Sequence, residues 1–181
     1  MRRSCTPTGP ISEPSMLIVL SGPPAAGKTS VGEELAKRFP RSVFFSLDTI
    51  RHFVKSGYAE PWRDEAAEQL RLSESIAAEM IKRQTEAGYV VIIDGIFLDD
   101  QLKKFKSQFH DVHGFVLLPS LETVIRRDRE RPADQREPER SQILHRDFSR
   151  ATFTDFRVLD STEQSLAETV DAIHRGITSS P

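Results

Sequence analysis

A glycine-rich segment close to the N-terminus carries the most specific chemical pattern in this chain. Residues 22–29 read GPPAAGKT and match G-x-x-x-x-G-K-[ST] at every position. In this pattern, backbone amides surround phosphate oxygens at the start of a helix, the lysine reaches the β- and γ-phosphates, and the hydroxyl holds Mg²⁺. An apolar run at residues 16–20 precedes the segment, and Val31, Leu35 and Phe39 follow it at helical spacing. The sequence therefore predicts a binding site for a nucleoside triphosphate.

The expected phosphate-binding residues span this loop and the first turn of the helix. They are Gly22, Pro23, Pro24, Ala25, Ala26, Gly27, Lys28, Thr29 and Ser30. We expect Lys28 to act in catalysis as well, because its charge meets the γ-phosphate, and we expect Thr29 to be a magnesium ligand.

Asp48 and Arg51 follow the second apolar run of the chain. A carboxylate near a γ-phosphate orients an acceptor hydroxyl or takes its proton, so Asp48 is a candidate catalytic base and substrate-binding residue. The alternative is that Asp48 only caps a helix that starts at Thr49. Arg51 is expected either to pair with Asp48 or to bind substrate, or else to be an ordinary surface arginine.

Asp94 ends an almost wholly apolar run. In P-loop enzymes this is a common position for the acidic residue that supports Mg²⁺, so Asp94 is a candidate metal residue. Two alternatives stay open at this stage: Asp94 binds the substrate, or it forms a turn with Gly95.

The segment from Glu122 to Arg140 is rich in arginine and contains no lysine. Guanidinium groups bind pairs of phosphate oxygens, so Arg127 and Arg131, four residues apart on an expected helix face, are candidates for nucleotide binding and catalysis. We expect residues 127–140 to form a short lid that closes over the nucleotide. The alternative is a solvated helix whose charges pair internally.

Three weaker features remain. The loop 57–62 contains Tyr58, which is expected to line an acceptor pocket unless the loop only anchors the following helix. Residues 160–162 (Asp-Ser-Thr) are expected either to border the nucleotide base or to cap the last helix, and capping is the preferred interpretation. His110 and His113 lack the neighbours that a zinc site needs, so no zinc is expected.

Five apolar runs alternate with helical patterns along the chain, which predicts a parallel α/β sheet covered by helices on both faces. The runs are residues 16–20, 42–47, 89–93, 112–118 and 156–159. The helical patterns after the first helix cover residues 63–87, 98–108, 121–130, 141–150 and 162–175. Ligands gather at the carboxyl ends of strands in such sheets, and three of these ends carry an aspartate.

Composition limits the possible partners and the domain count. The 181 residues suit a single domain over residues 16–181, after a disordered tail at residues 1–15. The net charge of −2 argues against a long nucleic-acid track, and no apolar stretch has the roughly 20 residues of a membrane span. The single cysteine is typical of a reducing cytoplasm. We expect a cytoplasmic monomer or homodimer.

The chain resembles the compact P-loop kinases in several motifs taken together. These are GPPAAGKT, Asp48-x-x-Arg51, Asp94, Arg127 with Arg131, and the segment 158–162 (VLDST). Within that group the chain looks most like the kinases grouped with chloramphenicol phosphotransferase, and more distantly like shikimate kinase, gluconate kinase and zeta toxins. The resemblance covers nearly the whole chain. It implies a three-layer fold with a five-stranded parallel sheet in the order 2-3-1-4-5. It also implies ATP and Mg²⁺ as cofactors, and Asp48 as the base.

The resemblance implies phosphoryl transfer from Mg-ATP to a hydroxyl of a small molecule, which is the leading functional hypothesis. Shikimate kinases carry two aspartates after the second strand, and gluconate kinases also differ there, so neither substrate is favoured. The alternatives are a kinase for a nucleotide sugar or a polynucleotide end, and a non-catalytic ATP-binding module. A switch GTPase is excluded because the chain has no N-K-x-D, and a ring-forming motor because it is too short for a helical lid domain.

Overall fold

The computed structural model describes residues 16–178, so the tail expected at residues 1–15 lies outside the described residues. Its centre is one parallel sheet of five strands in the order β2-β3-β1-β4-β5, which confirms the predicted order. The strands are β1 (Met16–Ser21), β2 (Ser42–Ser46), β3 (Val90–Asp94), β4 (Asp111–Leu117) and β5 (Phe156–Leu159).

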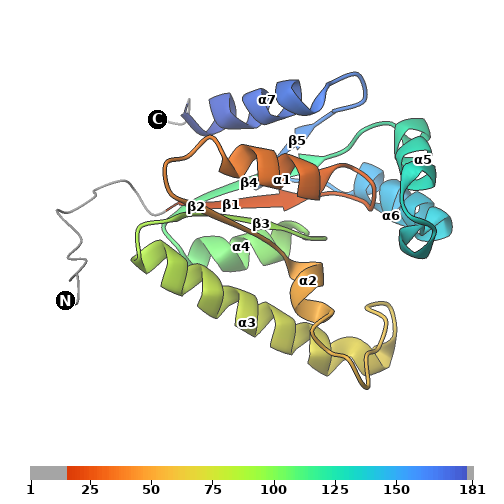
Figure 1. Ribbon diagram of the computed structural model, residues 1–181, viewed down its shortest axis with the longest axis horizontal. Coiled ribbons are helices and arrows are strands. Elements are labelled where there is room, and N and C mark those ends of the chain that lie inside the picture. Colours follow the sequence, from red (N-terminus) through yellow and green to blue (C-terminus); the bar gives the residue numbers. More distant parts are fainter. Residues whose placement is uncertain (1–15, 179–181) are drawn as a thin grey trace, which may run out of the picture.

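Helices cover both faces of this sheet (Figure 1). The α-helices are α1 (Lys28–Ala36), α2 (Leu47–Arg51), α3 (Ala67–Glu86), α4 (Asp99–Gln108), α5 (Leu121–Glu130), α6 (Pro138–Arg150) and α7 (Leu166–Thr178). Two short 3₁₀ helices, η1 (Asp64–Ala66) and η2 (Ala133–Gln135), precede α3 and α6. In Figure 1, α1 and α7 lie on one face, α3 and α4 lie on the other, and α5 and α6 stand together at one end. This arrangement confirms the predicted three-layer fold.

The alternation of side chains along β1 builds a separate core on each face of the sheet. Leu17 and Val19 belong to the core under α3 and α4, where Ile81 and Leu102 are fully buried. Ile18 and Leu20 point the other way and pack with residues of α1 and α7. β1 is therefore buried on both faces, as a central parallel strand must be.

Strand register brings the carboxyl ends of three strands together. Leu20 of β1 lies beside Asp94 of β3, and Asp94 lies beside Ser46 of β2. The residues that follow these strand ends therefore meet at one edge of the sheet. Within residues 16–178, no helix combines the length and the apolar character that crossing a membrane requires.

Several helix starts differ from the sequence prediction: α3 begins at Ala67 instead of residue 63, and α6 begins at Pro138 instead of residue 141. The starts of α2 and α7 bear on predicted roles. α2 begins at Leu47 with Ser46 as its N-cap, so Asp48 lies inside the first turn and does not cap a helix at Thr49. α7 begins at Leu166, because the hydroxyl of Ser165 accepts from the amide of Glu168 and the Glu168 carboxylate accepts from the amide of Ser165. The expected capping role of residues 160–162 is therefore wrong.

Candidate active site

The loop between β1 and α1 has the backbone shape of an anion nest. Gly22, Ala25 and Gly27 have positive φ values of 139°, 57° and 95°. A Cβ atom on Gly22 would lie 2.3 Å from the carbonyl oxygen of Leu117, so only glycine fits at this position. Gly27 is the N-cap of α1 and offers no side-chain acceptor, so the first amides of the helix keep their hydrogens for a ligand. The loop predicted from GPPAAGKT thus has the backbone that phosphate binding requires.

Lys28 is held over this loop. Its Nζ donates to the carbonyl oxygens of Gly22 and Pro23, both at 2.9 Å. Burial lowers the pKa of Lys28, while the charges of Asp94 and Asp48 act in the opposite direction. The ammonium group therefore lies within electrostatic reach of both candidate carboxylates, as the sequence hypothesis requires.

Thr29 and Asp94 make a direct contact beside the loop. The Thr29 hydroxyl donates to Oδ2 of Asp94 at 2.7 Å, and Asp94 is 1% exposed. Oδ1 of Asp94 is buried without a hydrogen-bond partner among the described residues. Burial raises the pKa of Asp94, and the hydroxyls of Ser46 and Thr29 and the charge of Lys28 only partly offset it. A turn-forming role for Asp94 does not explain this buried, half-satisfied carboxylate.

The Thr29–Asp94 pair fits Mg²⁺. Mg²⁺ prefers hard oxygen ligands and usually binds through one or two protein groups, waters and substrate phosphates. The hydroxyl of Thr29 and the unpartnered Oδ1 of Asp94 supply such oxygens next to the loop. Residues 16–178 contain no cluster of three or more His, Cys, Asp or Glu side chains that could hold a metal without a ligand's help.

Replacing Asp94 with asparagine should separate metal binding from stability. Because burial raises the pKa of Asp94, ionising this group weakens the folded state, so we expect Asp94→Asn to unfold at the same temperature as wild type or higher at neutral pH. We also expect the variant to lose most of the Mg²⁺-dependent gain in ATP affinity. Thermal melts and titrations of ATP with and without Mg²⁺ measure both effects.

The sign of the pH dependence provides the control. Above its raised pKa in the folded protein, Asp94 is ionised and its burial penalty is complete; below its unfolded pKa the penalty is absent. Any stability advantage of Asp94→Asn at neutral pH should therefore shrink as the pH falls toward 3.8. An advantage that grows on acidification would contradict this account.

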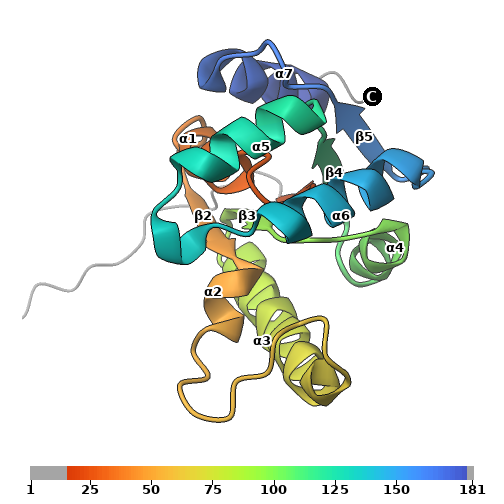
Figure 2. The same cartoon turned by 90° about the vertical axis from the view of Figure 1, so that its right-hand side faces the viewer.

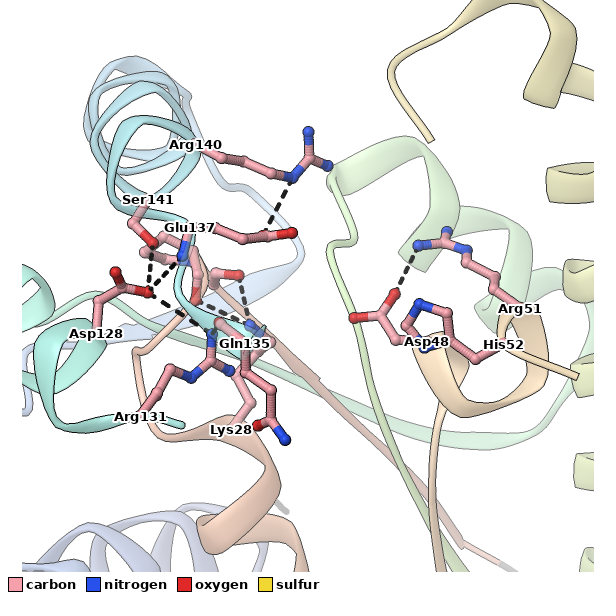
Figure 3. A network of polar contacts seen from close by, with 12 residues as sticks. Lys28, Asp48, Arg51, His52, Asp128, Arg131, Gln135, Glu137, Arg140 and Ser141 are labelled. Carbon is pink, nitrogen blue, oxygen red and sulfur yellow. Dashed lines mark hydrogen bonds and ion pairs between the residues drawn. The ribbon is translucent and has the colours of Figure 1, made fainter. Parts of the chain in front are cut away.

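Asp48 and Arg51 form an ion pair in the short helix α2. Nη1 of Arg51 donates to Oδ1 of Asp48 at 2.8 Å. The Arg51 side chain is only 10% exposed, whereas that of Asp48 is 50% exposed. Arg51 is therefore not an ordinary surface arginine, and it fixes a carboxylate that stays open to the site. Figure 3 shows this pair on one side of the site, with Lys28 and Arg131 on the other.

Arg127 links two loops around the expected nucleotide. Its Nη1 donates to the carbonyl oxygen of Ala26 at 3.2 Å, and its Nη2 donates to that of Ser161 at 3.3 Å. Burial, followed by the nearby charge of Arg126, lowers the pKa of Arg127. The charge pattern alone allowed a solvated helix, but Arg127 contacts the phosphate loop directly.

Arg131 lies one residue beyond the end of α5 and has an extended backbone. The expectation that Arg127 and Arg131 share a helix face is therefore wrong, because the helix stops at Glu130 before Pro132. Both side chains nevertheless line one cavity of about 400 Å³. Its other walls are residues 25–31 and, after β5, Ser161, Gln164, Leu166 and Thr169.

Tyr58 lies in the segment that joins α2 to α3. Its hydroxyl is 3.3 Å from Nε2 of His52, and the two rings are 5.3 Å apart. Burial raises the pKa of Tyr58, and the negative charges of Glu60, Asp48 and Glu137 add to the shift. Tyr58 is thus within electrostatic range of the candidate base Asp48 and of Glu137 at the start of α6.

Trp62 connects the same segment to α6. The Arg140 guanidinium lies 4.1 Å from the centre of the Trp62 ring, and the Trp62 side chain stays more than half exposed. The interpretation of this loop as a simple hydrophobic anchor for α3 does not account for that contact. Figure 2 shows this segment projecting below the front of the molecule, where α5 and α6 face the viewer.

Sequence reasoning missed two residues of this region, Arg140 and Asp128. Trp62 and Arg140 are far apart in the chain, and no local pattern signals their contact. Asp128 is 1% exposed, and its Oδ1 lies 3.8 Å from Nη1 of Arg131. The i,i+3 spacing of an acidic and a basic residue was a usable signal for this second pair.

Comparisons with known proteins agree with this fold. The sequence profile described as "AAA domain" matches residues 18–145. The sequence has no significant match among proteins of curated function.

Three solved structures illustrate the structural likeness. A gluconokinase from Sinorhizobium meliloti aligns with a TM-score of 0.67 and 19% identity, over 91% of this chain and 93% of that one. The tunicamycin resistance protein of Deinococcus radiodurans aligns with a TM-score of 0.65 and 16% identity, over 90% of this chain and 95% of that one. Shikimate kinase from Acinetobacter baumannii, in complex with shikimate, aligns with a TM-score of 0.58 and 23% identity, over 91% of this chain and 93% of that one. The chain therefore has the fold of the compact P-loop kinases, as its sequence indicates.

Proposed function

The chain belongs to the AAA domain family. We propose that it is an ATP-dependent phosphotransferase acting on a hydroxyl group of a small molecule. One observation carries the proposal. A half-exposed carboxylate, Asp48, is fixed by the buried Arg51 on the opposite side of the site from Lys28 and Arg131. A carboxylate that is held in place outside the nucleotide cavity is suited to orient an acceptor hydroxyl.

Each group has a distinct part in the proposed reaction. The amides at the start of α1 and the ammonium of Lys28 bind the β- and γ-phosphates, and Arg127 holds the loops around the nucleotide. Mg²⁺, bound through Thr29 and supported by Asp94, would neutralise charge on the phosphate oxygens. Asp48 orients the acceptor hydroxyl and accepts its proton as the hydroxyl oxygen bonds to phosphorus.

Arg131 is proposed to stabilise the transferring phosphoryl group, because it lines the nucleotide cavity close enough to Lys28 for its charge to lower that lysine's pKa. We propose that residues 127–140 act as the lid. A closed lid excludes water, which would otherwise compete with the acceptor for the phosphoryl group.

The contact between Trp62 and Arg140 is expected to support acceptor binding and to leave ATP binding unaffected. We expect Trp62→Ala to raise KM for the acceptor about two- to five-fold, since an exposed cation–π contact contributes about 0.5–1 kcal/mol. KM for ATP should stay unchanged, because neither side chain lines the nucleotide cavity. Trp62→Phe, which keeps an aromatic ring for Arg140, is the matched control. Its KM for the acceptor should lie between the values for wild type and Trp62→Ala. Steady-state kinetics with each substrate varied in turn distinguishes these outcomes.

A screen for acceptor-dependent release of ADP tests the proposed function. The panel should contain polyols, sugar acids, nucleosides and hydroxyl-bearing antibiotics, with gluconate, shikimate and tunicamycin as reference compounds from the names of the structural relatives. We expect at least one small hydroxyl compound to raise ADP release above the rate with water alone. Phosphorylation of an oligonucleotide end, with no small molecule active, would instead support the polynucleotide alternative.

A further inference from the structure

Asp128 is a buried carboxylate that the proposed chemistry does not use. It lies on α5 directly after Arg127 and is 1% exposed, although ionisable side chains are rarely buried without partners. Its Oδ1 accepts from the backbone amide of Glu137 at 3.2 Å and from the hydroxyl of Ser141 at 3.4 Å. The same oxygen lies 3.8 Å from Nη1 of Arg131. One carboxylate oxygen is therefore shared by three groups, two from the turn between α5 and α6 (residues 131–137, here called the lid turn) and one from α6 itself.

The first role of Asp128 is to attach the start of α6 to α5. Glu137 is the N-cap of α6 and makes no side-chain cap hydrogen bond, and Pro138 in the first turn has no amide hydrogen. From the neighbouring helix, Asp128 accepts the hydrogen bond of the Glu137 amide at the N-cap position and places negative charge near the positive end of α6. The start of α6 is therefore fixed to α5.

The second role concerns the turn between these helices, residues 131–137. Nη1 of Arg131 also donates to the carbonyl oxygen of Gln135 at 3.2 Å, and Nε of Arg136 donates back to that of Arg131 at 2.8 Å. The turn thus closes on itself, and its first and last residues, Arg131 and Glu137, both meet Asp128 (Figure 3). The position of the Arg131 guanidinium depends on this arrangement.

We propose that Asp128 is a positioning residue that fixes both ends of the lid turn and so directs Arg131 toward the γ-phosphate. This inference rests on the proposed function, because it requires Arg131 to contact a triphosphate. It goes beyond that function by assigning a role to a group that touches neither nucleotide nor acceptor. A purely structural role, in which Asp128 only holds α5 against α6, makes different predictions.

The test compares two nucleotides that differ at the γ-phosphate, Mg-ADP and Mg-AMP-PNP. In wild type, we expect Mg-AMP-PNP to bind more tightly than Mg-ADP, so the ratio of the Kd for ADP to the Kd for AMP-PNP exceeds one. We expect Arg131→Ala to reduce this ratio. Asp128→Asn can still accept both hydrogen bonds through its amide oxygen but has no charge for Arg131. We expect it to reduce the ratio by about five-fold, toward the Arg131→Ala value, with ADP affinity within about two-fold of wild type. Glu122→Gln, which removes an exposed charge from the same helix, is the control and should change neither affinity.

The outcomes separate this inference from the proposed function. Any of three results would overturn the positioning role. The first is a wild-type ratio of the two Kd values in Asp128→Asn, and the second is an unchanged ratio in Arg131→Ala. The third is an equal loss of affinity for both nucleotides in Asp128→Asn together with a lower melting temperature. If wild type bound neither nucleotide, the proposed function would fail, and this inference with it.

Hydrogen exchange on the wild-type protein gives a test that does not depend on a folded variant. The amide of Glu137 donates to the buried Asp128, so it should exchange as slowly as the amides inside α6, even without nucleotide. Asp134, an exposed residue of the same turn, provides the fast reference. Exchange at Glu137 as fast as at Asp134 would show that the end of the turn is not fixed, and would overturn the proposal.

Discussion

Asp48→Asn is expected to lower kcat for phosphoryl transfer by about 10²- to 10⁴-fold, the usual contribution of a general base. Asparagine keeps the size of the side chain and can still accept the hydrogen bond from Arg51, but it cannot take a proton from the acceptor. ATP affinity should stay close to that of wild type, because Asp48 lies outside the nucleotide cavity. Transfer rates with the acceptor found by screening, together with ATP titrations, measure both quantities.

The control for this variant is Glu65→Gln, which removes an exposed carboxylate from η1 and should leave kcat unchanged. If Asp48→Asn transferred phosphate at the wild-type rate, the assignment of Asp48 as the base would be wrong. A non-catalytic ATP-binding module makes a third prediction: ATP binds to both proteins, and no hydroxyl compound accelerates ADP release from either. These three outcomes separate the proposed function from its main alternative.

Arg131→Ala is the second variant with a large expected effect. Arginine side chains that stabilise a transferring phosphoryl group contribute about 10³- to 10⁵-fold to kcat. We expect a loss near the lower limit, about 10³-fold, because Lys28 and Mg²⁺ would still neutralise part of the developing charge. A change confined to KM for ATP would show instead that Arg131 is a binding group.

Arg129→Ala and Arg127→Ala are the comparisons for this result. Arg129 lies on the same helix and is exposed, so its removal should have no effect on kcat. Arg127 bonds to the carbonyl oxygens of Ala26 and Ser161, so its removal should mainly weaken ATP binding. A loss of kcat in Arg129→Ala as large as in Arg131→Ala would mean that the total charge of the helix, not a directed guanidinium, is responsible.

The sheet and the phosphate loop were predictable from the sequence because their signals are local. Apolar runs marked the strands, and the glycine spacing fixed the loop, where Gly22 packs against the carbonyl oxygen of Leu117. Asp94 was placed correctly at a strand end because strand ends meet at one edge of a parallel sheet. The helix over residues 121–130 was also predicted with its observed bounds.

Contacts between distant segments were not predictable. Ser46 and not Asp48 occupies the N-cap position of α2, and Ser165 with Glu168 starts α7 after residues 160–162. Only tertiary context distinguishes these helix starts from the predicted ones. The pairing of Trp62 with Arg140 has no local pattern. Asp128 shows the same limit, because its i,i+3 spacing to Arg131 is a local signal but only the packing of α5 on α6 reveals that it is buried.

The most direct measurement is calorimetric titration of the full chain with Mg-ATP, alongside Lys28→Met. We expect one site per chain with a Kd between about 1 μM and 1 mM, in the range of substrate affinities typical of enzymes. We also expect Lys28→Met to lose most of this affinity, since the loop then has no ammonium for the phosphates. Absence of any binding heat with wild type, for ATP and for every other nucleoside triphosphate tried, would contradict the account at its base.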